Sequence, residues 1–476
     1  MAICDRRKTI NRGALEENIL AIIDASEAKD SQDAHDDRIA FLEAVRATSI
    51  VSESRTQPSY KICQAVFKIL RIEKSLELII TSYQLLNELD KCFPRVYLSG
   101  IDQLESTNKH MTELVVVKEA WSPFIFSLEI ASSERGAAKD AEGLLDSSGF
   151  LILIQYLADV ADENTFQSCD TKSLGKMLLF QYLVNILEGD FIPRKTMYEE
   201  TTNWILLRES LLNMLLVSRK INFKSLMKDC LTIMCKLYQI CIGFSDDVVC
   251  PDNSVSKSTK KCDVAVEITS LEVGKNTSIA VRKLLNMIME LDTCKNKADA
   301  QGCTTRADGV RTPLVEIILD ELTYNNDILQ PFLQVFDDPK LKLEVVEQYF
   351  WKYISKPSVR TRRSNGSADD TTFIGALKCF SNVTSTRSII KKIGTEEAQL
   401  LLVHGFQAYL SVPSRQYPDE DNSHGNPESR SSSVIDICKN MISAFKSLRT
   451  AAEHMEILLC SKEALFMAAT ILSVNS

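Results

Sequence analysis

Apolar residues along the chain recur mainly at the three- and four-residue spacing of an α-helix. Few segments alternate with the period of two that a half-buried strand requires. One clear helix start lies at Asp338 and Pro339, because Asp is a favoured N-cap and Pro is favoured at the first helical position. Beyond this start, Leu341, Val346 and Phe350 fall on one helical face. The pattern therefore predicts an all-α protein.

The predicted helices are about 10 to 20 residues long, a length that suits short antiparallel packing. Two of them, Lys172–Leu187 and Trp204–Val217, are apolar on more than one face, which indicates inner helices covered from two sides. Stacked helix pairs with such inner helices form an α-solenoid. No repeat of fixed length is visible, so we expect an irregular armadillo/HEAT-like helical-repeat solenoid. The predicted helices are Ala14–Ala25, Asp36–Val51, Tyr60–Arg71, Ser75–Cys92, Phe150–Ala161, Lys172–Leu187, Tyr198–Val217, Phe223–Cys241, Ile279–Leu291, Leu314–Leu322, Leu341–Ile354, Glu396–Leu410, Val434–Leu448 and Glu453–Val474.

Polar segments interrupt this pattern, but they do not separate blocks of different character. We therefore expect one extended helical body over residues 1–476 rather than independent domains. Three interruptions are predicted to be flexible loops, at residues 245–262, 355–372 and 411–433. The last contains three prolines among Ser, Asp, Asn and Glu residues, with almost nothing apolar to bury. The sequence leaves the local structure of residues 238–278 and 411–433 open.

The composition narrows the class of protein further. Of 476 residues, 45% are hydrophobic and 25% are charged, which excludes a mostly disordered chain, a collagen-like fibre and a membrane protein. The 55 basic and 64 acidic residues give a formal charge of −9, so any contact with nucleic acid is expected to be local. The longest apolar stretch, Met177–Leu187, is too short to span a bilayer. The charged start of the chain is no secretory signal, and a cytosolic or nuclear protein is expected.

The residues that usually support catalysis or metal binding form no recognisable site. The 14 cysteines lie mostly among apolar residues and the five histidines are not spaced with them as zinc ligands, so reduced buried thiols are expected. The segment most similar to a phosphate-binding loop, Gly274–Thr277, lacks both the hydroxyl residue directly after the Lys and the upstream Gly of that motif. His404 lies in an apolar run and is expected to be a helix-face histidine rather than a base. We expect no catalytic, cofactor-binding or metal-binding residues.

One segment is strongly basic within this acidic chain. Lys356, Arg360, Arg362 and Arg363 follow the Leu341–Ile354 helix with no acidic residue among them. They could stabilise the negative end of that helix dipole. Alternatively, they could form a nuclear-localisation patch or contact phosphate groups. Four charges alone would give only weak, salt-sensitive binding to nucleic acid.

The chain also contains several blocks of sequence that are too long to be chance matches to a short motif, and these blocks follow one another in a consistent order. They extend over most of the chain, and the strongest run lies between Met289 and Arg363. That run ends in Lys356-Pro-Ser-Val-Arg-Thr-Arg-Arg363. The other blocks are Leu15–Asp24, Arg38–Arg46, Trp121–Phe124, Tyr198–Trp204 and Ser218–Asp229, and the strongest run comprises Met289–Asp292, Gly309–Pro313, Ile318–Tyr324, Phe332–Lys340 and Lys356–Arg363.

In these blocks the chain resembles the plant family of negative regulators of systemic acquired resistance, the inducible suppressors of the NPR-one mutant. The resemblance implies a nuclear, armadillo-like helical protein without catalytic residues. It also implies a subunit of the SMC five–six complex, resembling non-SMC element six, in DNA double-strand-break repair by homologous recombination. The family is further described as repressing pathogenesis-related genes. Residues 238–278 and 411–433 depart from the family pattern.

Two functional hypotheses follow from the residues and the resemblance together. The first is a scaffold or adaptor whose partners are SMC five–six subunits, a second non-SMC element and transcription regulators, with DNA reached indirectly. Under this hypothesis the protein binds no membrane and has no small-molecule substrate. The alternative is a direct DNA-binding transcriptional repressor that uses residues 356–363. The net charge of −9 and the absence of a recognisable DNA-reading helix weigh against the alternative.

Overall fold

The described part of the chain is almost entirely helical. A computed structural model gives it 17 α-helices, one π-helical turn, one 3-10 turn and a single two-stranded sheet. The expected all-α, helical-repeat fold is thus confirmed. The structure describes residues 32–51, 55–99, 112–117, 120–126, 144–162, 170–246, 261–305, 308, 311–354, 372–412 and 427–474.

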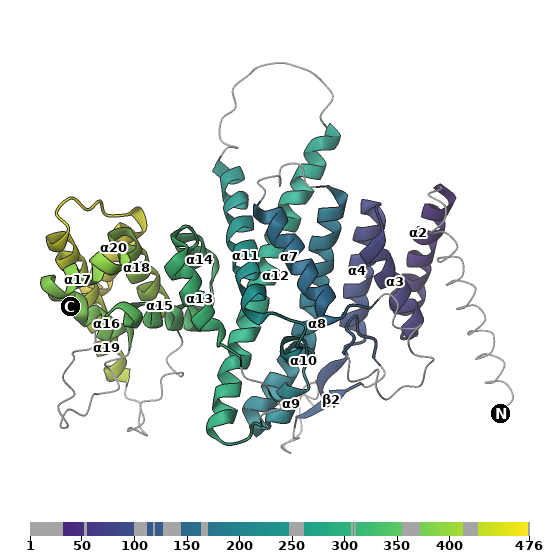
Figure 1. The fold of residues 1–476 in the computed structure, drawn as a ribbon, viewed down its shortest axis with the longest axis horizontal. Coiled ribbons are helices and arrows are strands. Elements are labelled where there is room, and N and C mark those ends of the chain that lie inside the picture. The colour runs from purple at the N-terminus through teal and green to yellow at the C-terminus, as the bar shows by residue number, and fades with distance from the viewer. Residues whose placement is uncertain are drawn as a thin grey trace. The chain divides into compact units, whose positions relative to one another are not determined.

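The chain forms two compact units, residues 1–314 and 315–476 (Figure 1). Each unit has its own helices and its own buried residues. The expectation of one continuous body over residues 1–476 stays a prediction.

In the first unit the helices pack side by side around α8 (Thr171–Thr201), which contacts α4, α7 and α12 (Figure 1). Tyr182, Leu183 and Val184 are consecutive residues of α8, and all are fully buried. Consecutive burial means that neighbours cover the helix all round, as the apolar run 172–187 predicted. The other helical elements of this unit are α2 (Gln32–Arg46), η1 (Ala47–Val51), α3 (Tyr60–Ile72), α4 (Leu76–Cys92), α7 (Ser147–Asp162), α9 (Trp204–Arg208), α10 (Leu211–Val217), α11 (Phe223–Asp246) and α12 (Lys261–Ala300).

The single helix expected over Tyr198–Val217 is wrong, because the chain breaks twice there. Thr202 follows α8 in the left-handed conformation with φ 53°, which ends the helix. The Asn203 side chain then accepts the Ile205 N–H at the start of α9. Ser210 accepts the Asn213 N–H at the start of α10 in the same way. Both residues are favoured N-caps, so they restart the helix in new directions.

A short antiparallel hairpin was not expected from the sequence. Strand β1 (Val96–Ser99) pairs with β2 (Glu113–Val116), with Val96 opposite Val116. Both strands contact α8. Four residues are too few for an alternating pattern to be distinguished from a helical one, so the sequence alone could not predict them.

The second unit packs short helices around a core of aromatic residues. The ring of Phe350 lies 5.5 Å from that of Phe380, edge to face, and 6.4 Å from that of Phe373. The predicted cap is present, because the Asp338 carboxylate accepts the Leu341 N–H at 2.9 Å. The helical elements are α13 (Leu314–Tyr324), η4 (Asn326–Ile328), α14 (Leu329–Val335), α15 (Pro339–Tyr353), α16 (Phe373–Phe380), α17 (Val383–Ile393), α18 (Thr395–Ser411), α19 (Pro427–Ala451) and α20 (Leu459–Val474).

Several predicted boundaries differ from the structure. Helix α12 extends to Ala300, well beyond the predicted end at Leu291. Helix α19 begins at Pro427, so the predicted loop over 411–433 is wrong for residues 427–433. Helices α14, α16 and α17 were not predicted, since each is short. The predicted helix Ala14–Ala25 and most of the predicted loops 245–262 and 355–372 lie outside the described residues.

Candidate functional site

The basic segment singled out in the sequence cannot be placed. Lys356, Arg360, Arg362 and Arg363 lie outside the described residues. Lys392, in the last turn of α17, donates from Nζ to the Tyr353 carbonyl at 3.0 Å. The interpretations of the segment as a phosphate contact or a nuclear-localisation patch therefore stay predictions.

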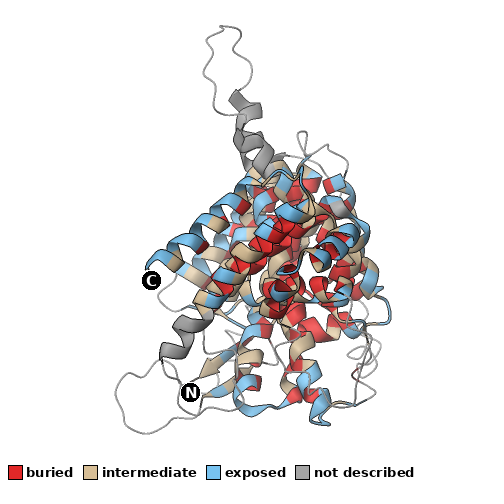
Figure 2. Ribbon diagram, turned by 90° about the vertical axis from the view of Figure 1, so that its left-hand side faces the viewer, coloured by how far each residue is buried: buried red, intermediate tan, exposed pale blue. Residues whose placement is uncertain are grey.

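The described surface instead presents an apolar face on the C-terminal helix α20. Leu459, Phe466 and Val474 are 72%, 76% and 78% exposed, and Met467 is 42% exposed. At 100° per residue these four positions lie within about a third of a turn, so they form one face. Figure 2 shows that the helix ending at the C-terminal label is exposed along much of its length. We call these four residues the α20 face.

The opposite side of α20 is firmly packed. Ser461, Ala464 and Ala468 are buried against α18 and α19. The segment that leads into α20 is oriented by Gln399, which is fully buried. Its Nε2 donates to the Glu456 carbonyl at 3.0 Å, and its Oε1 accepts the Leu458 N–H at 3.2 Å. The small buried residues and this amide fix which side of the helix is turned outward.

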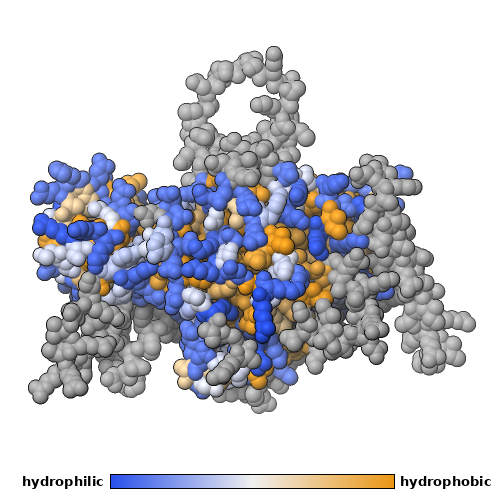
Figure 3. Space-filling model, viewed as in Figure 1, coloured by the Kyte–Doolittle hydropathy of each residue, from blue (hydrophilic) through white to orange (hydrophobic). Residues whose placement is uncertain are grey.

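The terminal helix of a helical stack usually turns a polar side to water, because no further helix covers it. Helix α20 turns large apolar side chains outward as well, beside the exposed polar residues Glu463 and Thr470 on the same side. An exposed apolar patch of this kind marks a site of protein association more often than scattered apolar residues do. Elsewhere, Figure 3 shows hydrophobic residues over the middle of the first unit, where α7 and α8 are labelled in Figure 1. One of these helices, α7, exposes 63% of Ile152.

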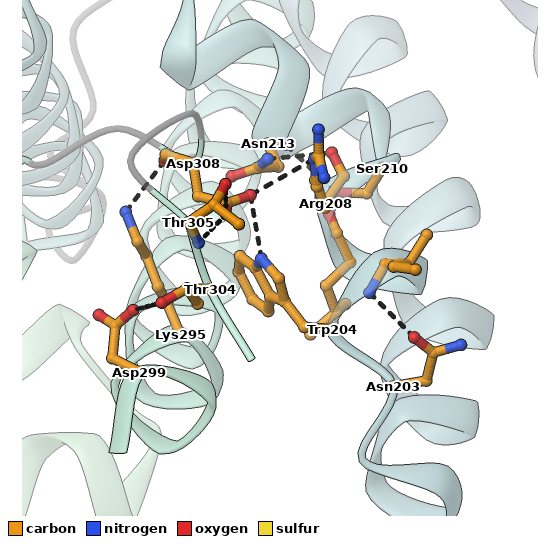
Figure 4. Close-up of polar contacts among 12 residues, drawn as sticks. Asn203, Trp204, Arg208, Ser210, Asn213, Lys295, Asp299, Thr304, Thr305 and Asp308 are labelled. Atoms are coloured by element: carbon orange, nitrogen blue, oxygen red, sulfur yellow. Dashed lines mark hydrogen bonds and ion pairs between the residues drawn. The ribbon is translucent and has the colours of Figure 1, made fainter. Parts of the chain in front are cut away.

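A buried polar cluster joins α9 to the end of α12 around the Asp308 carboxylate (Figure 4). One oxygen accepts the Trp204 indole N–H at 3.1 Å, and Arg208 lies 3.4 Å from the same oxygen. The other oxygen accepts the Thr305 N–H at 2.6 Å and the Thr305 hydroxyl at 3.0 Å. Lys295 donates to the Asp308 carbonyl at 3.1 Å. The protein's own donors thus occupy both carboxylate oxygens, which makes this cluster a structural element.

Electrostatics agree with a permanently charged Asp308. Burial by itself raises the pKa of this carboxyl, but the N–H of Thr305, the indole of Trp204 and the hydroxyl of Thr305 together hold the pKa below its usual value. The nearby Arg208 guanidinium acts in the same direction. Trp204 closes the sequence block Tyr198–Trp204, so the structure gives that block a physical role.

Replacing Asp308 with asparagine should lower the free energy of unfolding by about 1–3 kcal/mol. The reason is that the asparagine NH2 group would replace one carboxylate oxygen and face a donor that this oxygen accepts from. Urea unfolding followed by circular dichroism measures the change. The matched control is Asp299→Asn, at an exposed carboxylate near the end of α12 that contacts the Thr304 hydroxyl. We expect the control to change stability by less than about 0.5 kcal/mol. Equal losses in the two variants would contradict the proposed role of Asp308.

Within the described part of the chain, the residues that could support catalysis or metal binding form no such site. No cluster of three His, Cys, Asp or Glu residues with metal-binding geometry occurs there. Burial raises the pKa of the Cys63 and Cys235 thiols to about 12, which leaves them unreactive. Burial, and then Lys342, lower the pKa of His404 to about 4, so this histidine is neutral at pH 7. The hydroxyl of Thr277, in the segment similar to a phosphate-binding loop, donates instead to the Val273 carbonyl within α12.

No described helix combines the length and the apolar character that crossing a bilayer requires. The cysteines whose side chains the structure describes are free thiols.

Comparison with known proteins gives matches that cover most of the chain. Residues 95–338 match the family model of the SNI1 middle domain, and residues 354–476 match that of the SNI1 C-terminal domain. The protein "Negative regulator of systemic acquired resistance SNI1" of Arabidopsis thaliana is 45% identical over 469 residues, which cover 98% of this chain and 96% of that protein. No solved structure matches the chain. The family suggested by the sequence blocks is therefore confirmed: the chain belongs to the SNI1 family, whose Arabidopsis thaliana member is a negative regulator of systemic acquired resistance.

Proposed function

We propose that this chain is a non-catalytic nuclear adaptor subunit of the SMC five–six complex. In this role it acts in double-strand-break repair by homologous recombination, and its contacts with partner proteins also restrain pathogenesis-related genes. The observation that supports an adaptor is the α20 face, a row of large apolar side chains on a helix whose other side is packed. The Arabidopsis relative is described as a regulator, which agrees with a non-catalytic role.

The geometry of the α20 face suits a helical partner. Leu459 and Phe466 are seven residues apart, as are Met467 and Val474, so the two pairs form two adjacent rows along one side of α20. A second non-SMC element that offers an apolar helix would cover this face as the next layer of the stack. Burying a Phe or Met side chain contributes about 1.5–3 kcal/mol. Phe466 is therefore the side chain expected to contribute most.

The test is capture of the tagged protein from nuclease-treated plant nuclear extract, with bound proteins identified by mass spectrometry. We expect the unaltered chain to retain SMC five–six subunits after nuclease treatment. Phe466→Glu should reduce their recovery at least about tenfold, because the new carboxylate would be buried without a partner. The variant should melt at the same temperature as the unaltered chain, since Phe466 is 76% exposed.

The matched control is Ile152→Glu, which places the same charge on another exposed apolar residue, in α7. It should retain the SMC five–six subunits. Equal loss in both variants would remove the α20 face from the proposal. Loss of the SMC five–six subunits on nuclease treatment, with transcription factors retained, would replace the adaptor by the alternative, a DNA-binding repressor that uses residues 356–363.

A further inference from the structure

A groove lies between the C-terminal end of α3 and the N-terminal end of α8, two helices that contact each other in the first unit. Its volume is about 580 Å³, within the range of small-ligand sites in proteins. No local pattern in the sequence indicates this groove, because its two walls are about 100 residues apart in the chain. The groove is lined by Leu70, Arg71, Ile72, Glu73, Lys74, Asp170, Thr171, Lys172, Gly175 and Lys176.

Four of the ten lining side chains are cations. Arg71 and Lys74 come from the end of α3 and the residues after it, and Lys172 and Lys176 come from the first turns of α8. Burial lowers the pKa of Lys176, and the charges of Arg71 and Lys172 lower it further. The cations therefore repel one another across the groove. A bound anion would relieve this repulsion.

Neutral groups help to hold the cations in place. Arg71 donates from Nη1 to the Leu144 carbonyl at 3.3 Å. Lys176 Nζ lies 3.5 Å from the Arg71 carbonyl oxygen. The Lys172 ammonium lies 5.3 Å from the centre of the Tyr156 ring. All three cations line the groove, and the Leu144 carbonyl and the Tyr156 ring belong to residues outside that lining.

The two carboxylates of the groove already have partners. Glu73 forms an ion pair with Arg38 of α2, and both side chains are largely buried. Asp170 caps α8 by accepting the Ser173 N–H at 2.8 Å. The hydroxyl of Ser173, then its N–H and the charge of Lys172, hold the pKa of Asp170 below its usual value. The groove thus has an excess of positive charge within a chain whose net charge is −9.

We propose that this groove, the α3–α8 cationic groove, binds the phosphate group of a phosphorylated serine or threonine side chain on a partner protein. A phosphate monoester has about −1.5 to −2 charge and three acceptor oxygens, which suits several cations converging from two walls. Ile72, 56% exposed among the lining residues, offers apolar contact to a neighbouring side chain.

The same features favour a phosphorylated protein over a nucleic acid. Nucleic-acid binding requires cations spread along a broad track that neutralises many phosphates. Here four cations line one concave site in an acidic chain. The groove is separate from the α20 face, so either proposal can fail without the other. Its functional consequence is that phosphorylation of a partner strengthens that partner's binding to this chain.

The test uses the full chain and fluorescence anisotropy with two probes, a phosphoserine-centred peptide pool with randomised flanking residues and the same pool unphosphorylated. We expect binding of the phosphorylated pool alone. Lys172→Met with Lys176→Met should weaken it at least about tenfold while keeping the apolar stems that pack in α8. The control, Lys439→Met with Lys462→Met, removes two exposed lysines of the second unit and should leave binding unchanged.

If the double variant at Lys172 and Lys176 melts early, Lys74→Glu with Lys172→Glu changes two exposed residues and tests the groove without touching a half-buried one. Equal binding of the two pools, or binding that survives both groove variants, would overturn the proposal. A 20-base-pair duplex that binds while the phosphorylated pool does not, and that is lost in the groove variants, would reassign the groove to nucleic acid.

Discussion

Replacing Asp190 with alanine is expected to lower the free energy of unfolding by about 3–5 kcal/mol, because it leaves a buried guanidinium without its charge partner. Asp190 lies in α8, and its side chain is 1% exposed. Arg194 Nε lies 3.3 Å from one of its oxygens, and Arg95 Nε lies 3.8 Å from the other. The Leu211 N–H, at the start of α10, donates to the same carboxylate at 2.8 Å.

Loss of Asp190 therefore has two costs. Arg194, whose side chain is 4% exposed, would remain charged in the interior. The Leu211 N–H would lose its acceptor at the first position of α10. Burial raises the pKa of Asp190, although Arg194 and the Leu211 N–H oppose the rise, so desolvation is already the larger effect in the native protein.

Urea unfolding of Asp190→Ala measures this loss. The matched control is Glu188→Ala in the same helix, where a carboxylate that is 34% exposed pairs with Lys283 at 2.8 Å and a loss below about 1 kcal/mol is expected. The double variant Asp190→Leu with Arg194→Met should recover most of the stability, because it removes both charges and fills similar volume. A loss from Asp190→Ala no larger than that of the control would contradict the assignment.

The second large effect is a change in how stability depends on pH, expected for Asp90→Asn. Asp90 lines a small cavity of about 30 Å³ with Cys63, Trp121 and Tyr182, which has room for about one water molecule. Within the described residues, Asp90 Oδ2, Trp121 Nε1 and Tyr182 Oη are buried without hydrogen-bond partners. Burial raises the pKa of Asp90 to about 7, and the Tyr182 hydroxyl nearby opposes the rise.

The sign follows from comparing the folded and unfolded states. Between pH 4 and 7 the unfolded chain has lost the Asp90 proton while the folded chain retains it. The neutral carboxyl therefore favours the folded state below the unfolded pKa, and this contribution is lost as pH rises through 7. Asparagine is neutral at every pH. The free energy of unfolding of the Asp90→Asn variant, relative to that of the unaltered chain, should thus increase by about 2–4 kcal/mol between pH 4 and pH 8.

Urea unfolding at pH 4, 6 and 8 checks this expectation. The difference between the two chains isolates Asp90, because other titrating groups are common to both. Cys63 and Tyr182 face the same cavity, but their ordinary pKa values lie above pH 8 and burial raises both further. The control Asp37→Asn replaces an exposed carboxylate in α2 and should show a constant difference. A constant difference for Asp90→Asn as well would show that Asp90 does not titrate in this window.

Much of the fold was readable from local patterns. The Asp338–Pro339 pair predicted the start of α15, and the structure shows the Leu341 N–H bonded to the Asp338 carboxylate. The all-round apolar run 172–187 predicted that α8 is an inner helix. These features depend on residues within a few positions of each other, so a sequence records them directly.

Other features of the fold also have a local signal in the sequence, but the apolar pattern indicated a different structure at those positions. The breaks on either side of α9 occur where Asn203 and Ser210 cap the next helix. Both are favoured N-caps, but Trp204–Val217 reads as one continuous apolar stretch. The buried Asp308 carboxylate orients the helix between them through Trp204 and Arg208. Periodicity cannot show such a partner 100 residues away.

The sequence by itself determined the helical class, the absence of a recognisable catalytic motif and the family, because each depends on residue types in order along the chain. Only the tertiary structure decided which side chains meet. It turned the α20 face outward by burying Ser461, Ala464 and Ala468. It also brought the cations at the end of α3 to those at the start of α8. Burial and convergence are properties of packing between distant segments, so the candidate surfaces emerged only when those segments were placed together.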